Sequence, residues 1–497
     1  MQDFDVIVVG AGVAGASLAT VLGRNGKRVL CVERDLQEPD RIVGELLQPG
    51  GCRKLVELGL EESLKGIDAQ NVFGYGIFLR DKRTKVYYLP REQQAFTAEQ
   101  AEEAASFSRN MCVGRSFHNG RFVKNLRNLA MREKLVMLVE GNVCDLILKN
   151  TKTNTETETD LAGVEDHSSH FVVTGVKYKT KQGNIVSVRA PLTIVCDGCF
   201  SRFRSKVNKA AEFKVFSYFV GLVLENCTLP YPNFGHVILG DPAPVLFYPI
   251  SSTETRCLVD IPSKFMQQEG GSWTTELYMR DIVAPQLPDE LREAFLTALS
   301  KGKYKMMPNR VMPARPASLP GVILLGDSFN MRHPLTGGGM TVALSDIFLL
   351  NQLLSPLPDF GEWDCVDRAL REFYRERRKY CSTINILANA LYSVFCATGS
   401  EESDEMRSAC FDYLSKGGRL ATDPVSMLGG LQSSPYLLLT HFFAVALYGC
   451  GRQLKYFPNM GRIRTSWCLF RHAFNIVKPL IDDENVTFLS KIPISHI

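Results

Sequence analysis

The sequence predicts an α/β protein with three parts: a Rossmann-type dinucleotide-binding domain, an α+β domain dominated by a sheet, and a helical C-terminal region. Two glycine-rich turns, about three hundred residues apart, predict the first part because each follows an apolar strand and opens a helix. Short apolar strands over residues 211–316 predict the second part, and long helical segments after residue 361 predict the third.

The first turn is the sequence GAGVAG at residues 10–15, after an apolar strand at residues 4–9. Its glycines, Gly10, Gly12 and Gly15, let backbone N–H groups and a helix N-terminus meet a pyrophosphate. Glu33 follows the next strand, eighteen residues after Gly15, a spacing that predicts a carboxylate on an adenosine ribose. An NAD-binding domain would show the same pattern, so this turn alone does not decide the cofactor.

The second turn decides between these cofactors. A strand at residues 322–325 leads to Asp327, whose carboxylate is placed to accept from a ribityl hydroxyl. The next helix opens at Gly338 and Gly339, and its N-terminus is expected to face the pyrimidine edge of a flavin. Arg127, in a helix at residues 120–132, is the candidate phosphate contact, and a further Asp-Gly turn follows at residues 197–198. This set of turns indicates an FAD monooxygenase.

The predicted domains follow from these positions. Residues 1–90, 115–210 and 317–360 form the discontinuous FAD-binding domain, and residues 211–316, with contributions from 75–90, form the substrate-binding domain. Residues 361–497 form the helical region. The polar segments 91–108 and 151–170 are expected to be surface insertions.

Three separated motifs resemble squalene epoxidases: VGELLQPGG at residues 43–51, NMRHPLTGGGMTV at 330–342 and HFFAVA at 441–446. The resemblance implies a glutathione-reductase-type FAD-binding fold. It also implies conversion of squalene and dioxygen to 2,3-oxidosqualene in sterol biosynthesis, through a flavin C(4a)-hydroperoxide. The protein's task in this chemistry is positioning and the exclusion of water.

The resemblance also implies site residues. The flavin contacts carried over by motif are Val13, Ala14, Glu33, Arg34, Arg41, Arg127, Val143, Asp327 and Met340. Tyr75 and Gln48 are expected near the reacting face of the flavin, joined by a hydrogen bond. The expected lining of the squalene tunnel is Tyr75, Ile77, Pro334, Leu335, Phe395 and His441. No metal site is expected.

Several of these residues have an alternative interpretation. Tyr75 would also fit an ordinary cross-strand aromatic, and His441 and Phe395 would fit residues of the core. Arg41 would fit a surface charge. Cys196 and Cys199 form a CxxC pair, but no second pair exists to complete a zinc site.

The electron supply is expected to be external. No second dinucleotide fingerprint occurs, which fits electrons arriving from an NADPH-dependent diflavin cytochrome reductase at the membrane. Two alternatives stay open: a self-sufficient FAD hydroxylase of aromatic or lipid substrates, and a lipid-binding escort protein that uses the flavoprotein fold.

Composition and hydropathy bear on location. The chain has 497 residues, 45% hydrophobic and 22% charged, and a net charge of +4, too small to argue for nucleic acid. No signal peptide is expected. The apolar stretch at residues 436–450 is about 22 Å long as a helix, shorter than roughly 30 Å of hydrocarbon. We expect peripheral or monotopic attachment to membrane lipid on the cytosolic face of the endoplasmic reticulum, with help from Arg452, Lys455, Arg462, Arg464, Arg471 and Lys478.

Overall fold

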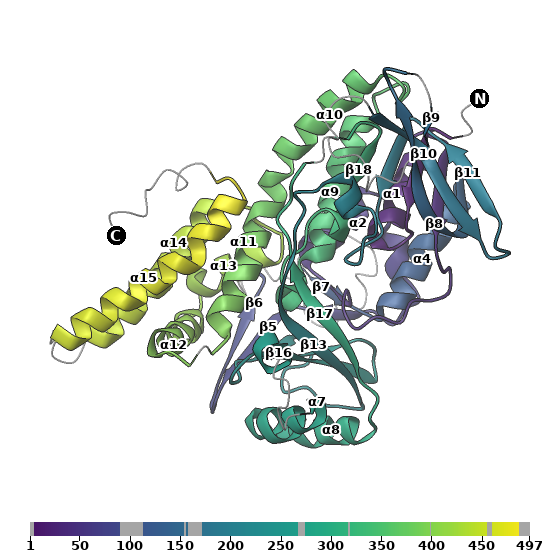
Figure 1. Cartoon of the computed structure of the whole chain (residues 1–497). Coiled ribbons are helices and arrows are strands. Elements are labelled where there is room, and N and C mark those ends of the chain that lie inside the picture. Colours follow the sequence, from purple (N-terminus) through teal and green to yellow (C-terminus); the bar gives the residue numbers. More distant parts are fainter. Residues whose placement is uncertain are drawn as a thin grey trace.

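The computed structural model describes residues 4–89, 113–153, 156–157, 171–266, 274–316, 319–397, 399–454 and 460–486. Figure 1 shows two sheets side by side and an arm of helices that ends in the α14–α15 pair. The predicted α/β fold class is confirmed, whereas the domain boundaries stay a prediction. The proposed insertion at residues 91–108 and most of that at 151–170 lie outside the described residues.

The first sheet carries the dinucleotide-binding fold, in the order β11-β10-β8-β2-β1-β12-β18, with β9 paired to β8. Its strands are β1 (Val6–Val9), β2 (Val29–Glu33), β8 (Val136–Asn150), β9 (Glu156–Thr157), β10 (Phe171–Thr180), β11 (Ile185–Arg189), β12 (Leu192–Val195) and β18 (Val322–Leu324). The neighbours from β8 to β18 run parallel, whereas β10 and β11 run antiparallel. Strands β1 and β12 are buried throughout, because a parallel sheet is covered on both faces.

Four helices pack together along this sheet: α1 (Val13–Arg24), α4 (Asn119–Arg132), α9 (Gly339–Leu354) and α10 (Trp363–Glu376). Their apolar residues share one core with alternate residues of β1, such as Val6 and Val8. The other residues of β1, Ile7 and Val9, join a second core on the opposite face. The N-termini of α1 and α9 therefore meet the carboxyl ends of the parallel strands, where ligands bind in open α/β sheets.

The second sheet has the order β17-β13-β16-β15-β14-β5-β6. Its strands are β5 (Gly74–Leu79), β6 (Lys82–Tyr87), β13 (Lys214–Glu225), β14 (Gly235–Ile238), β15 (Val245–Pro249), β16 (Glu254–Pro262) and β17 (Lys305–Val311). Parallel pairing of β5 with β14 joins the early hairpin to the later strands. A small sheet of β3 (Leu46–Leu47), β7 (Gly114–Ser116) and β4 (Gln70–Val72) lies beside α2 (Pro49–Glu57).

The helical segment between β16 and β17 is interrupted. The short helix α7 (Thr275–Leu277) continues into a π-helical turn, η4 (Tyr278–Val283), and a 3-10 turn, η5 (Ala284–Gln286), before α8 (Asp289–Ser300) begins. Pro285 and Pro288 explain the break, because proline lacks the N–H that continues a helix. Helix α8 covers one face of the second sheet.

The C-terminal region consists of α11 (Arg378–Phe395), α12 (Glu401–Ser415), α13 (Arg419–Leu428), α14 (Pro435–Leu454) and α15 (Met460–Asp483). Helix α14 extends beyond the apolar stretch at residues 436–450, and it packs against α12 and α15. Apolar residues of all five helices share one core with β5, β6 and the inner face of the second sheet. Among the described residues, no helix is both long and apolar enough to cross a membrane.

Candidate active site

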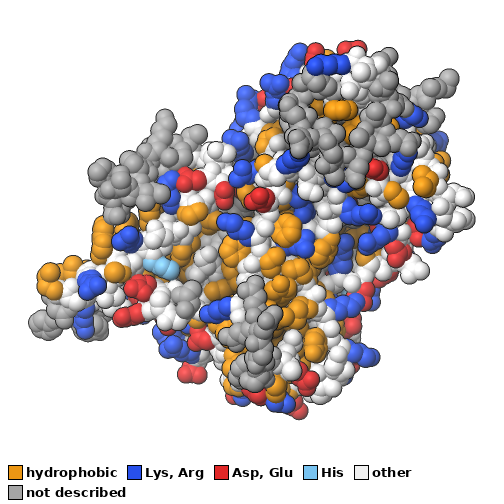
Figure 2. All heavy atoms as spheres, in the orientation of Figure 1, with side chains coloured by type: hydrophobic (Ala, Val, Ile, Leu, Met, Phe, Trp, Pro, Cys, Tyr) orange, Lys and Arg blue, Asp and Glu red, His pale blue; other side chains and the backbone are white. Residues whose placement is uncertain are grey.

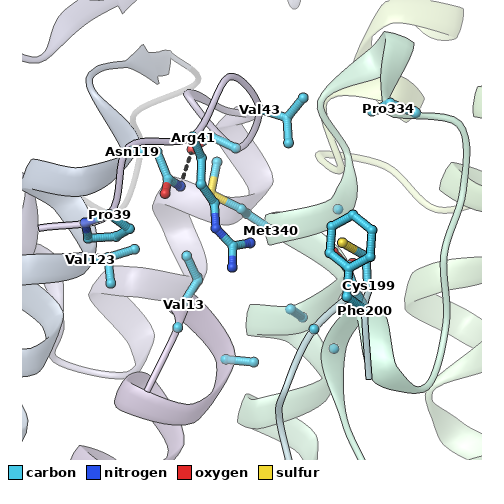
Figure 3. Close-up of a pocket in the computed structure, with 18 of the residues that line it drawn as sticks. Val13, Pro39, Arg41, Val43, Asn119, Val123, Cys199, Phe200, Pro334 and Met340 are labelled. Carbon is cyan, nitrogen blue, oxygen red and sulfur yellow. Dashed lines mark hydrogen bonds between the residues drawn. The ribbon is translucent and has the colours of Figure 1, made fainter. Parts of the chain in front are cut away.

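A cavity of about 730 Å³ lies where the two glycine turns and the second sheet meet. All the predicted cofactor residues line it except Gly15 and Gly338. Figure 3 shows the side chain of Arg41 extending into this space from the loop before Val43, between Val13 and Met340. Arg41 is exposed because its side chain faces this cavity.

Gly15 and Gly338 have a packing role. A Cβ at Gly15 would lie 1.8 Å from the carbonyl oxygen of Gly10, so only glycine lets α1 approach the strand before it. A Cβ at Gly338 would lie 2.5 Å from Cγ2 of Ile384 on α11. Neither residue lines the cavity, so their assignment as cofactor contacts stays a prediction.

The first glycine turn has the shape of a phosphate cradle. Gly10 has φ +95°, a conformation that favours glycine, and a Cβ at Gly12 would meet nothing within 4 Å. Gly12 is the N-cap of α1 and provides no side chain to occupy the first N–H groups of the helix. These groups are available to a pyrophosphate, as the sequence predicts.

Glu33 and Arg127 fix this turn from both sides. The Ala11 N–H donates to Oε2 of Glu33 at 2.6 Å, and Nε of Arg127 donates to the Ala11 carbonyl at 2.8 Å. Nη1 of Arg127 donates to the Gln37 carbonyl at 2.9 Å, and its Nη2 lies 3.6 Å from Glu33. Arg127 thus holds the nucleotide loops together in addition to facing the cavity.

The second turn places a carboxylate and a helix N-terminus on the same cavity. Asp327 lies in a 3-10 turn, η6 (Gly326–Ser328), and is exposed to the cavity. Gly337 has φ +64°, and a Cβ at Gly339 would meet nothing within 4 Å, so the start of α9 leaves open space for a ligand. The residues of the two glycine turns thus fit the two ends of one long dinucleotide cofactor.

Arg204 is a structural residue that the sequence did not reveal. This buried guanidinium donates to the carbonyls of Cys199 and Asp327 at 3.1 and 2.9 Å, and so joins the turn at 197–199 to the turn at 326–328. Nothing in the local pattern marks it, because its partners at Asp327 and Ser328 are more than a hundred residues away. Burial raises the pKa of Asp197 in the first of these turns.

Gln48 and Tyr75 make the predicted hydrogen bond. Nε2 of Gln48 donates to the Tyr75 hydroxyl at 2.5 Å and to the Thr336 carbonyl at 2.6 Å. The Tyr88 hydroxyl, a partner that sequence reasoning missed, donates to Oε1 of Gln48 at 2.7 Å. The Gln48 amide is therefore fixed by three neighbours. Tyr75 lines the cavity, Gln48 lies fully buried behind it, and burial raises the pKa of Tyr75.

The predicted tunnel residues divide into two groups. Pro334 and Leu335 line the cavity with Tyr75. Ile77 on β5 and Phe395 at the end of α11 lie away from its wall, in the apolar core that also contains Tyr75 and Leu335. His441 on α14 is also away from the wall, with Nδ1 3.0 Å from the Tyr413 hydroxyl and Nε2 3.5 Å from Asp423.

The cavity wall also holds a buried ion pair. Glu45 accepts from Nε and Nη2 of Arg256, both at 2.8 Å, and from the Tyr248 hydroxyl at 3.2 Å. The pair ties the loop before β3 to β16, so the small sheet and the second sheet are held together beside the cavity.

Comparison with solved structures defines the class of fold. The chain superimposes on Klebsiella pneumoniae HpxO, solved with FAD and uric acid, with a TM-score of 0.61 at 16% identity, over 86% of this chain and 98% of that one. Together with the two glycine turns, this likeness defines the FAD-dependent monooxygenase fold.

The sequence comparisons then identify the family. Residues 189–467 match the squalene epoxidase family model. The chain is 50% identical to squalene epoxidase 3 of Arabidopsis thaliana, over 97% of this chain and 85% of the relative, and 39% identical to squalene monooxygenase of Mus musculus, over 97% and 78%. The chain belongs to the squalene epoxidase family.

Proposed function

We propose that this protein is an FAD-dependent monooxygenase that inserts one oxygen atom of dioxygen into a terminal alkene of squalene, giving 2,3-oxidosqualene. The observation that carries this function is the juxtaposition of two dinucleotide turns with an apolar wall, Pro334 and Leu335, in one cavity of a chain from this family. A squalene epoxidase requires both: a cofactor that activates dioxygen and a surface that accepts a hydrocarbon.

The cavity residues fit FAD. We assign the first N–H groups of α1 and the side chain of Arg41 to the pyrophosphate, and Glu33 to the adenosine ribose, because all of them line the cavity or its first turn. We assign Asp327 to the ribityl chain and the N-terminus of α9 to the pyrimidine edge. Bound FAD would supply the activation of dioxygen, because none of the side chains does redox chemistry of this kind.

The protein itself positions the reactants and excludes water. The Thr336 carbonyl and the Tyr75 hydroxyl hold the Gln48 amide, so one hydrogen-bonded unit connects the cofactor turn to the substrate sheet. Burial keeps Tyr75 and Tyr88 in their neutral forms, because the pKa of both phenols is raised. We assign Tyr75 and Gln48 to positioning at the reacting face.

The apolar core beyond Tyr75 supports a route for a long polyene. It continues from Leu335 and Tyr75 through Ile77 and Phe395 to the C-terminal helices. We propose that squalene enters between these side chains. His441 would line the route and would not act as a base. The Tyr413 and Asp423 contacts of His441 support this, since both ring nitrogens already have partners.

The electron donor in this proposal is NADPH acting through a diflavin reductase. The proposal rests on the single GxGxxG turn in the sequence, which FAD itself requires. A reductase that carries its own flavins would deliver electrons at the cytosolic face of the endoplasmic reticulum.

The α14–α15 pair is proposed to seat the protein on that membrane. Several large side chains of these helices are exposed: Tyr436, Leu447, Met460, Ile463 and Trp467. Figure 2 shows hydrophobic and basic side chains together at the far end of this arm, at the left of the view. Of the basic residues expected to contact lipid, Lys455 lies outside the described residues, Arg452 pairs with Asp412 and Glu405, and Lys478 pairs with Asp482.

Product formation tests the proposed function. The FAD-loaded protein with squalene, NADPH, dioxygen and the diflavin reductase should give 2,3-oxidosqualene, and omission of the reductase should nearly abolish turnover. Rapid flavin reduction by NADPH alone would support the self-sufficient hydroxylase. Recovery of unchanged squalene from a protein that receives electrons would contradict the proposed substrate.

A further inference from the structure

A buried polar cluster that the proposed reaction does not use lies at the cavity wall, which its member Asn309 lines. It joins the second sheet, through Ser217, Asp260 and Asn309, to His333 before the turn η7 (Pro334–Thr336) and to Tyr392 on α11. The side chains of Asp260 and His333 are 0% and 1% exposed. Five elements thus converge on one enclosed set of hydrogen bonds.

The hydrogen bonds of His333 define its tautomer. Nδ1 accepts from the Leu335 backbone N–H at 3.3 Å, so the proton of a neutral ring is on Nε2, which lies 3.0 Å from the Ser217 hydroxyl. The ring stacks on Tyr392 with centroids 3.6 Å apart. Burial lowers the pKa of His333 to about 3, which keeps the ring neutral. Neutral His333 therefore fixes the backbone of Leu335, a cavity residue.

Asp260 connects to His333 through shared partners. Nδ2 of Asn309 donates to Oδ1 of Asp260 at 3.0 Å and to the Ser217 hydroxyl at 2.9 Å. The distance from Oδ1 of Asp260 to Nε2 of His333 is 3.9 Å. The same turn also receives the Gln48 amide at the Thr336 carbonyl, so this cluster and Tyr75 act on one short segment.

Among the described residues, no Arg or Lys compensates a charge on Asp260. The titratable groups that face it are His333 before η7, Tyr278 on η4, and Tyr392 and Cys396 at the end of α11. Burial raises the pKa of Tyr278, Tyr392 and Cys396, so all three are neutral near pH 7. In the described part of the chain, Asp260 forms no ion pair with Arg or Lys, and its Oδ2 accepts no hydrogen bond.

We propose that Asp260 is a positioning residue for squalene: its protonated carboxyl group keeps Ser217 and His333 in the arrangement that fixes the turn at 333–336, and its ionisation releases that turn. This inference rests on the proposed epoxidation of squalene. An ionised Asp260 would place an unpaired charge in the core, and the entry of water to solvate that charge breaks the chain of hydrogen bonds.

The pH at which this happens is set by burial. Burial raises the pKa of Asp260 to about 7, and the nearby Ser217, Tyr392 and Asn309 offset the effect only in part. The carboxyl group is therefore protonated below this pH and ionised above it. Because the unfolded chain releases this proton near pH 4, the folded state binds more protons between about pH 4 and 7, and its stability falls as the pH rises through that window.

Squalene binding to the oxidised, FAD-loaded protein without reductase tests the proposal. Squalene has no titratable group, so any pH dependence belongs to the protein. Perturbation of the flavin absorbance should report a Kd about tenfold higher near pH 8 than near pH 6, because only the protonated fraction binds. In turnover with the reductase, KM should carry this pH dependence more than kcat.

The variants Asp260→Asn and Ser217→Ala separate positioning from folding. Asp260→Asn preserves the shape of the side chain but cannot ionise. Its Kd for squalene should therefore be the same near pH 6 and near pH 8. Its melting temperature should also lack the fall that the wild type shows as the pH rises from about 4 to 7. Ser217→Ala breaks the link to His333 while Asp260 still titrates. Its Kd should also be pH-independent, but its melting temperature should keep the wild-type pH dependence. The control Asp367→Asn on α10, a partly exposed residue that pairs with Arg371, should behave as wild type.

Each other outcome contradicts the proposal. A pH-independent Kd in the wild type, or an unchanged pH dependence in Asp260→Asn, would overturn the role of Asp260 and leave the proposed function intact. If Asp260→Asn does not fold, the wild type and Ser217→Ala still decide the matter. Absence of squalene binding at every pH would contradict the proposed function and this inference with it.

Discussion

At the scale of single residues, the glycines and carboxylates of the cofactor cavity were predictable, whereas the groups that hold them were not. Gly10 and Gly337 adopt positive φ, a requirement that acts within one turn and leaves a local pattern in the sequence. Tyr88, Arg204 and Asp260 form hydrogen bonds with residues far away in the sequence. The residues next to them in the sequence show no pattern from which those partners could be identified.

The Gln48 amide provides a residue-scale prediction. Tyr75→Phe removes one hydroxyl but keeps the ring against Tyr88, and the Gln48 amide retains its bonds to Thr336 and Tyr88. The lost bond should cost about 1 kcal/mol, which corresponds to roughly fivefold slower epoxidation. FAD content should be unchanged. Turnover numbers normalised to bound flavin measure this effect.

The control for this prediction is Tyr178→Phe on β10, away from the cavity wall. It removes the same hydroxyl from a half-buried ring and should turn over at the wild-type rate. Wild-type turnover in flavin-loaded Tyr75→Phe would show that the Tyr75 hydroxyl is structural only.

At the scale of elements, the sequence predicted the strands and helices of the first sheet well, because glycine turns and apolar runs mark both ends of each. It was less accurate where packing decides. Helix α14 extends past Cys450, the end of the apolar stretch, because it packs between α12 and α15. The same packing explains why Arg452 pairs with acids of α12.

The α14–α15 pair provides an element-scale prediction. Removal of both helices would expose the core that they share with α12, so surface substitutions are a cleaner test. The double variant Ile463→Ser, Trp467→Ser removes two side chains that are 48% and 51% exposed. Membrane partitioning should fall roughly tenfold or more, since about 1.4 kcal/mol of lost apolar burial is a factor of ten.

Co-sedimentation with anionic vesicles measures this partitioning, with flavin absorbance as the check on folding. Leu296→Ser, an exposed leucine on α8, is the matched control and should leave co-sedimentation unchanged. Equal sedimentation of the double variant and the wild type would rule out this face as the membrane contact.

At the scale of the whole molecule, the site exists only because three parts meet. The first sheet contributes the two turns, the second sheet contributes Tyr75 and the Asp260 cluster, and α11 contributes Tyr392 and the packing partner of Gly338. The sequence predicted the parts and the family, but not how closely the C-terminal helices share the core behind the cavity, because such contacts join residues hundreds of positions apart.

The central claim, that this cavity transfers one oxygen atom of dioxygen to squalene, is tested most directly with labelled oxygen. The FAD-loaded protein, reductase, NADPH and squalene should be incubated under oxygen-18 gas, and the product examined by mass spectrometry. We predict 2,3-oxidosqualene that carries the heavy isotope in its epoxide. An epoxide whose oxygen comes from water, or a hydroxylated product without an epoxide, would contradict the account.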